Sequence, residues 1–170
     1  MDVERDRGRY HSSASGLTVV AHFFGILATI LMLVWLLHYR EGIDLDSDDA
    51  RRVFNVHPFL MFFGFIFMAG EAMMAYKTVK AEWQWLVGLA VFLPRSSPSH
   101  SKAMIAPWHV NGGRALLFMA IATALTGLME KATLMRLQHQ NEGRLINLLA
   151  LCILLFGISV DFSVSLARYA

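Results

Sequence analysis

The sequence is poor in charged residues and has a single cysteine. Lysine, arginine, aspartate and glutamate make up 16% of its 170 residues, whereas soluble domains carry about 25%. This shortage argues against a soluble globular domain, and the net charge of +2 gives no reason to expect a nucleic-acid partner. Cys152 lies inside an apolar run and has no second cysteine to pair with, so an intrachain disulfide is excluded.

Long apolar runs account for much of the 56% hydrophobic content. A helix needs about 20 apolar residues to cross a bilayer. Four runs have this length, and a fifth run at 83–93 is too short to cross and ends at Pro94, before a polar loop over 95–102. We therefore predict an all-α membrane protein with one domain, residues 1–170. It is a helical bundle of four full transmembrane helices plus a short half-helix fragment, with spans at about 16–37, 56–76, 108–129 and 145–166.

Positive charges flanking the spans predict the orientation, because cytoplasmic loops carry an excess of lysine and arginine. The N-terminal tail and the segment after the second span are basic, whereas the loop between the first two spans is rich in aspartate. Both termini are therefore expected in the cytoplasm.

Two histidines begin long apolar runs, His57 after Val56 and His109 after Trp108. Ionisable residues inside a membrane are costly and usually functional, and imidazole is a common ligand of haem iron. Covalent haem attachment of the c type is not expected, because no CxxCH motif is present. The two histidines start spans at opposite faces, on the order of 20 Å apart in depth. Ligands of one iron must lie within roughly 2 Å of it, so each histidine needs another partner.

Other ionisable residues leave alternatives open. His22 lies at a depth compatible with His109, and His38 lies near the level of His57, so the pairs His22–His109 and His38–His57 are possible substitutes. Otherwise His22 is a hydrogen-bonded core histidine and His38 an interfacial one. Glu71, alone in the second span, indicates a proton path or a neutral acid bonded to a neighbouring helix.

Two further features have both a functional and a plain interpretation. Lys77 and Lys80, with Lys102 and Arg114, form either a basic patch for a small anionic reductant or ordinary positive-inside anchors. Small residues of the third span, including Ala120, share a face that permits close helix packing.

Several motifs together carry a family resemblance. The sequence resembles cytochrome b561 proteins of the plant type from about Gly16 onward. The motifs are FNVHPFLM at 54–61, GEAMMAYKT at 70–78, PWHV at 107–110, TGLMEK at 126–131 and WLLHYREG at 35–42, with Asn147 and Phe156-Gly157 in the last span.

The resemblance implies transmembrane electron transfer through b-type haem, with two haems in the family. Electrons would pass from cytoplasmic ascorbate to monodehydroascorbate or ferric iron on the other side, making the protein an ascorbate-dependent ferrireductase-type oxidoreductase. His57 would ligate the outer haem iron and His109 the inner one, and Lys77 and Lys80 would contact the substrate. A multi-pass protein of an endomembrane, the vacuolar membrane or the plasma membrane is expected.

The sequence departs from this pattern after Lys80, where it passes directly to WQWLVG at 83–88. Helix three and half of helix four of the family are missing, together with their two ligand histidines. A working electron carrier would then need substitute ligands, five-coordinate haem or a homodimer. The alternative is a truncated, haem-free member that acts as a membrane partner of a full-length relative, or a non-functional isoform.

Overall fold

The fold is described from a computed structural model that covers residues 2–78 and 99–167. Within these ranges all regular elements are helices. They are α1 (Asp2–Val34), the π-helix η1 (Trp35–Tyr39), α2 (Ala50–Phe54), α3 (Val56–Phe59), the π-helix η2 (Leu60–Phe67), α4 (Met68–Thr78), α6 (Ser99–Leu134) and α7 (Asn141–Leu166).

The four predicted spans are confirmed. Within the described residues, four helical stretches are long and apolar enough to cross a membrane, and they comprise Asp6–Tyr39, Ala50–Ala75, Pro107–Leu134 and Asn141–Leu166. The protein is therefore a multi-pass helical membrane protein. The predicted short fragment at 83–93 lies outside the described residues.

Two helices are longer than the apolar runs predicted. α1 already begins at Asp2, and α6 begins at Ser99, so the loop expected over 95–102 is helical in its last four residues. α6 also continues through Pro107. Apolar runs report where a chain lies in hydrocarbon, whereas helices extend beyond the bilayer until a turn signal ends them.

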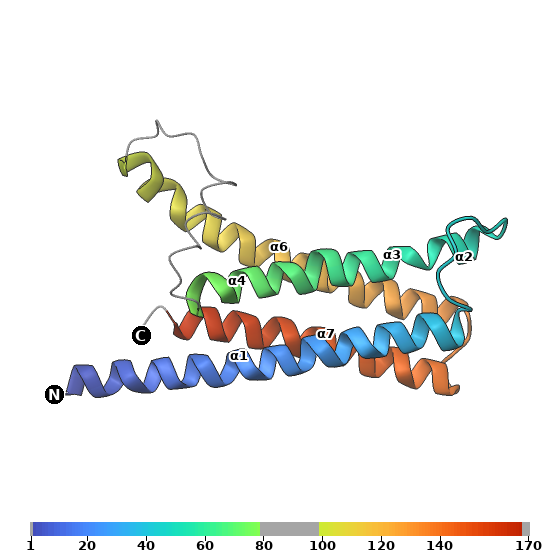
Figure 1. Ribbon diagram of the computed structural model, residues 1–170, viewed down its shortest axis with the longest axis horizontal. Helices are drawn as coiled ribbons and strands as arrows, with labels where there is room; N and C mark the ends of the chain where they lie inside the picture. Colours follow the sequence, from blue (N-terminus) through green and yellow to red (C-terminus); the bar gives the residue numbers. More distant parts are fainter. Residues whose placement is uncertain (1, 79–98, 168–170) are drawn as a thin grey trace.

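Figure 1 shows the helices as an elongated bundle. α1 and α7 pack side by side over most of their length, and α7 also contacts α4 and α6. α1 and α6 run in one direction, while α3–η2–α4 and α7 run in the other, so that α1 begins and α7 ends at the same end of the bundle (Figure 1). We call this the N-terminal end, and the end that carries α2 and α3 the opposite end.

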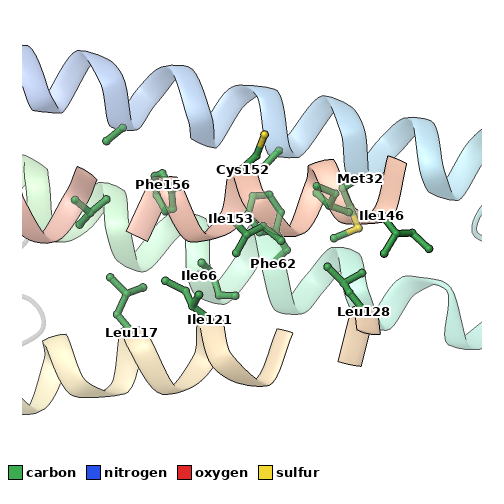
Figure 2. Packing of buried hydrophobic residues seen from close by; sticks show 14 of the residues in the cluster. Met32, Phe62, Ile66, Leu117, Ile121, Leu128, Ile146, Cys152, Ile153 and Phe156 are labelled. Carbon is green, nitrogen blue, oxygen red and sulfur yellow. The ribbon is translucent and has the colours of Figure 1, made fainter. Parts of the chain in front are cut away.

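Aromatic rings pack against glycines where helices approach closely. A Cβ atom on Gly25 of α1 would lie 2.6 Å from the Phe67 ring, and one on Gly70 of α4 would lie 2.5 Å from the Phe156 ring. Phe156 and Phe67 are themselves in contact, with ring centroids 5.7 Å apart. Figure 2 shows Phe156 within the buried cluster that joins all four spans. The relative rotation of these helices therefore follows from where glycines leave room for large rings.

The turn between α6 and α7 is a Schellman motif without glycine. The Leu137 amide donates to the Ala132 carbonyl oxygen at 2.9 Å, and the Arg136 amide donates to that of Thr133 at 3.0 Å. Arg136 has φ +56°, in the left-handed region that favours glycine. The turn also packs directly against the start of α7. Gly143 lies so close to it that a Cβ atom there would overlap the Leu137 carbonyl oxygen.

Arg136→Gly is therefore expected to stabilise the protein by about 1 kcal/mol, because it relieves the left-handed strain of a residue with a side chain. Thermal unfolding in detergent measures this. Arg144→Gly is the matched control, since Arg144 is an exposed residue inside α7. It should be destabilising by about 1 kcal/mol. Equal effects of the two substitutions would contradict the assignment of strain to Arg136.

Candidate functional site

A cavity of about 640 Å³ lies between the α3–η2 helix and α6. It is walled mainly by apolar side chains, and Met32, Trp35 and Ile153 of the first and last spans also contribute to it. The volume is within the range of about 300–1,000 Å³ that small-molecule and cofactor sites occupy.

Among the described residues, His57 is the one histidine in the wall of this cavity. Its imidazole is exposed and stacks on the Phe54 ring, with centroids 4.9 Å apart and an interplanar angle of 21°. The π-helical segment η2, which starts three residues later, carries Met61, Phe62 and Phe65 into the same wall. Wide helical turns of this kind occur frequently at functional sites.

Asn55 fixes the start of α3 relative to the end of the first span. Its side-chain amide donates to the carbonyl oxygens of Arg40 and Gly42, at 2.8 and 2.9 Å, and the residue is buried. The chain reverses at this point, because Glu41 and Gly42 both have positive φ. Asn55 therefore ties the segment carrying His57 to the preceding loop.

Glu142 organises the polar groups at the same end of the bundle. Its Oε1 atom accepts a hydrogen bond from the Trp35 indole N–H at 2.9 Å and is also paired with the Arg40 guanidinium group. All three side chains are largely withdrawn from solvent, and Trp35 lines the cavity. Sequence reasoning missed Glu142. The available signal was an acidic residue in the first turn of the last span, where a helix N-terminus favours negative charge.

The small-residue face of α6 contributes both to packing and to the cavity. Ala120 and Ala124 pack against the buried core, and both line the cavity together with Gly127. A Cβ atom on Gly127 would meet no other group within 4 Å. The predicted packing role is thus confirmed, and the same face leaves room opposite His57.

His109 lies outside the wall of this cavity. It is exposed on α6, seven residues before Leu116, the first residue of that helix in the wall. At 1.5 Å per residue, His109 is about 10 Å beyond the nearer limit of the cavity. Lys131, which shares the wall with His57, lies about 30 Å from His109 along the same helix. The expected separation of His57 and His109 in depth therefore agrees with the structure.

The other predicted histidines lie apart from the cavity wall. His38 is exposed and packs edge-on against Tyr39, with ring centroids 4.7 Å apart. His22 was predicted to be a hydrogen-bonded core histidine. It is hydrogen-bonded, but its side chain is 46% exposed, so it does not belong to the core. Its Nε2 atom lies 3.0 Å from Oε2 of Glu71, so the polar partner predicted for that acid is found. Ligation of iron by His22 or His38 stays a prediction.

The predicted basic patch loses one member. The Arg114 guanidinium group donates two hydrogen bonds to the Asp161 carboxylate, at 2.5 and 2.9 Å, and joins α6 to α7. Arg114 is thus committed to an ion pair and is not available to a soluble anion. The side chain of Lys77, and Lys80 as a whole, lie outside the described residues. Across residues 2–78 and 99–167, no group of three or more His, Cys, Asp and Glu side chains is placed to hold a bare metal ion.

In the part of the chain that the structure describes, four long apolar helices and a mainly apolar cavity with one histidine in its wall define a helical membrane protein with a candidate ligand site. The sequence model described as eukaryotic cytochrome b561 matches residues 56–84 and 80–135. The chain is thus similar to cytochrome b561 proteins, as its motifs predicted.

Relatives from plants and animals align with most of the chain. The probable ascorbate-specific transmembrane electron transporter 1 of rice is 29% identical, over 86% of this chain and 88% of its own length. Transmembrane ascorbate ferrireductase 2 of Arabidopsis thaliana is 27% identical, over 82% and 86%. The human plasma membrane ascorbate-dependent reductase is 28% identical, over 83% and 70%.

The same alignments measure the missing segment. The alignment with the rice protein has 207 positions, but 86% of 170 residues is only about 146, so about 60 positions have no counterpart in this chain. The two family matches meet at residues 80–84, which places a break there. This agrees with the predicted absence of about a helix and a half after Lys80.

Proposed function

We propose that this protein transfers electrons across a membrane through b-type haem, with His57 as the iron ligand in the cavity. The electrons would come from ascorbate on the cytoplasmic side and pass to monodehydroascorbate or ferric iron on the opposite side. Similarity to the family, four spans and the names of the relatives support this proposal. The observation that carries it is the apolar cavity of about 640 Å³ with an imidazole in its wall.

The residues of the cavity fit haem held by one protein nitrogen. The walls are mainly apolar, and there is open space beside Gly127. Haem, when bound, supplies reversible one-electron chemistry at the iron. His57 would hold the iron, and its stacking on Phe54 would restrict rotation of the imidazole ring.

The remaining parts of the proposal rest on residues beyond this cavity. His109 is proposed as a ligand of an inner haem, and Lys77 and Lys80 as contacts for the anionic reductant. The positive-inside pattern supports cytoplasmic termini, which is compatible with α1 beginning and α7 ending at one end of the bundle (Figure 1). Membrane lipid would surround the four spans whether or not haem is bound.

The test is an optical spectrum of the purified protein, oxidised and dithionite-reduced, with haem quantified per chain. We expect a b-type spectrum with at least one haem, held by His57. The ferrous form of this haem should also bind carbon monoxide, because the described residues of the cavity wall include no second imidazole. Two haems per chain without a carbon monoxide response would show that other histidines, or those of a second copy, complete the coordination. Absence of haem would overturn the proposal.

A haem-free partner role is the second candidate, favoured by the loss of about 60 positions relative to the rice transporter. In that case the chain would insert and associate with a full-length relative without carrying electrons itself. Co-purification with such a relative, in the absence of bound haem, would support this role. Isolation as a stable haem protein would exclude it.

A further inference from the structure

His22 and Glu71 form a contact between two spans that the electron-transfer proposal does not use. The His22 Nε2 atom on α1 lies 3.0 Å from Oε2 of Glu71 on α4. The Nδ1 atom of the same ring lies 2.7 Å from the Thr18 carbonyl oxygen. Both nitrogens of this imidazole therefore have a partner at hydrogen-bond distance, inside the spans Asp6–Tyr39 and Ala50–Ala75.

The Thr18 carbonyl oxygen fixes the proton on one side of the ring. A carbonyl oxygen only accepts hydrogen bonds, so the Nδ1 atom of His22 must carry a proton and donate it. The Nε2–Oε2 contact then needs one further proton. This proton lies either on Nε2, giving an imidazolium beside a carboxylate, or on Oε2, giving a neutral imidazole beside a carboxylic acid.

Both arrangements contain the same number of protons and have no net charge. Removing the shared proton would leave an unpaired carboxylate facing a bare nitrogen, and adding another would leave an unpaired imidazolium. A net charge within a membrane span is costly. The contact is therefore neutral only when it holds one shared proton.

The second oxygen of Glu71 favours the neutral arrangement. Its Oε1 atom is buried and has no hydrogen-bond partner within the described part of the chain. An ionised carboxylate with a bare buried oxygen costs more than a neutral acid in the same place. We therefore expect Glu71 to be the protonated member and Nε2 of His22 to accept.

The neighbouring helices add no competing charge among the groups described. On α7, Asp161 is paired with Arg114, Glu142 is paired with Arg40, and Cys152 is a buried thiol. The proton balance of the His22–Glu71 contact is thus set by its own two side chains.

We propose that His22 and Glu71 form a proton-binding site within the membrane, holding one shared proton. Moving this proton between Oε2 and Nε2 requires no change of rotamer. The His22 side chain is 46% exposed on the outside of the bundle, so the site is reachable rather than sealed in the core. The shared proton can therefore move between the two side chains without any net charge entering the span, whether or not the cavity at His57 holds haem.

The test combines ¹⁵N NMR of labelled histidine with infrared spectroscopy of the full-length protein in lipid nanodiscs, between about pH 6 and pH 8. We expect Nδ1 of His22 to be protonated, Nε2 to be unprotonated, and a carboxylic-acid C=O band that shifts in D₂O. Glu71→Gln should remove that band while the protein stays folded, because the glutamine amide can donate to Nε2 in place of the acid.

The matched control is His38→Asn, since His38 is exposed on the same helical span and forms no ion pair with a carboxylate among the described residues. It should leave the acid band unchanged, whereas His22→Asn should shift it. An imidazolium beside an ionised Glu71 would place the one proton on the ring and still support the site. A bare Nε2 together with an ionised Glu71, or a doubly protonated pair, would overturn it.

Discussion

The His57→Ala variant is expected to lose the haem absorbance of the reduced protein while it still inserts and folds. Within the described residues, His57 is the one imidazole in the cavity wall, so its removal leaves the iron without an imidazole ligand from these residues. Loss of a group that only orients a metal ligand lowers the affinity for the metal about 10- to 100-fold. Loss of the ligand His57 itself should lower the affinity for haem by at least that factor. The measurement is haem per chain, from the reduced-minus-oxidised spectrum of purified protein.

The structural cost of this substitution should be small. The imidazole stacks on the Phe54 ring, and such a ring pair contributes about 0.5–1.5 kcal/mol. The matched control is His38→Ala, because His38 lies at the same end of the bundle but outside the cavity wall. His57→Gly with added free imidazole should recover the absorbance. An unchanged spectrum in His57→Ala would show that the iron, if present, is held elsewhere.

The four spans could be predicted from the sequence because the thickness of a bilayer sets the length of an apolar run directly. The same reasoning separated His57 from His109, since each begins a span at a different face. Helix ends were less predictable. α6 starts at Ser99 inside a polar segment, where hydropathy carries no signal although the backbone is already helical.

The pairing of side chains between spans could not be predicted, because it depends on how each helix is rotated about its axis. Gly25 and Gly70 admit the rings of Phe67 and Phe156, and this packing sets those rotations. The sequence showed His22 and Glu71 as two lone ionisable residues 49 positions apart, without indicating that they meet. Glu142 was missed for the same reason, since its partners Trp35 and Arg40 belong to the first span and its end.

The second large effect is expected from Asp161→Ala, which should lower stability by about 2–3 kcal/mol. This variant leaves the Arg114 guanidinium group unpaired within a span, and an arginine or aspartate near the middle of a membrane helix costs about 2.5–3.5 kcal/mol. The bidentate geometry of the pair, with hydrogen bonds of 2.5 and 2.9 Å, indicates that each charge compensates the other. Thermal unfolding of purified protein in nanodiscs would measure the loss.

A double-mutant cycle separates the cost of an unpaired charge from the loss of packing. The double variant Arg114→Leu with Asp161→Leu removes both charges and keeps apolar volume, and replacing a buried ion pair in this way is often neutral or stabilising. We therefore expect it to be more stable than either Asp161→Leu or Arg114→Leu alone, the two single variants of the cycle. Additive losses in the cycle would mean that the two groups do not compensate each other. Recovery of stability in the double variant would show that the two side chains neutralise each other's charge within the spans. An Arg114 side chain engaged in this way does not bind an anionic reductant.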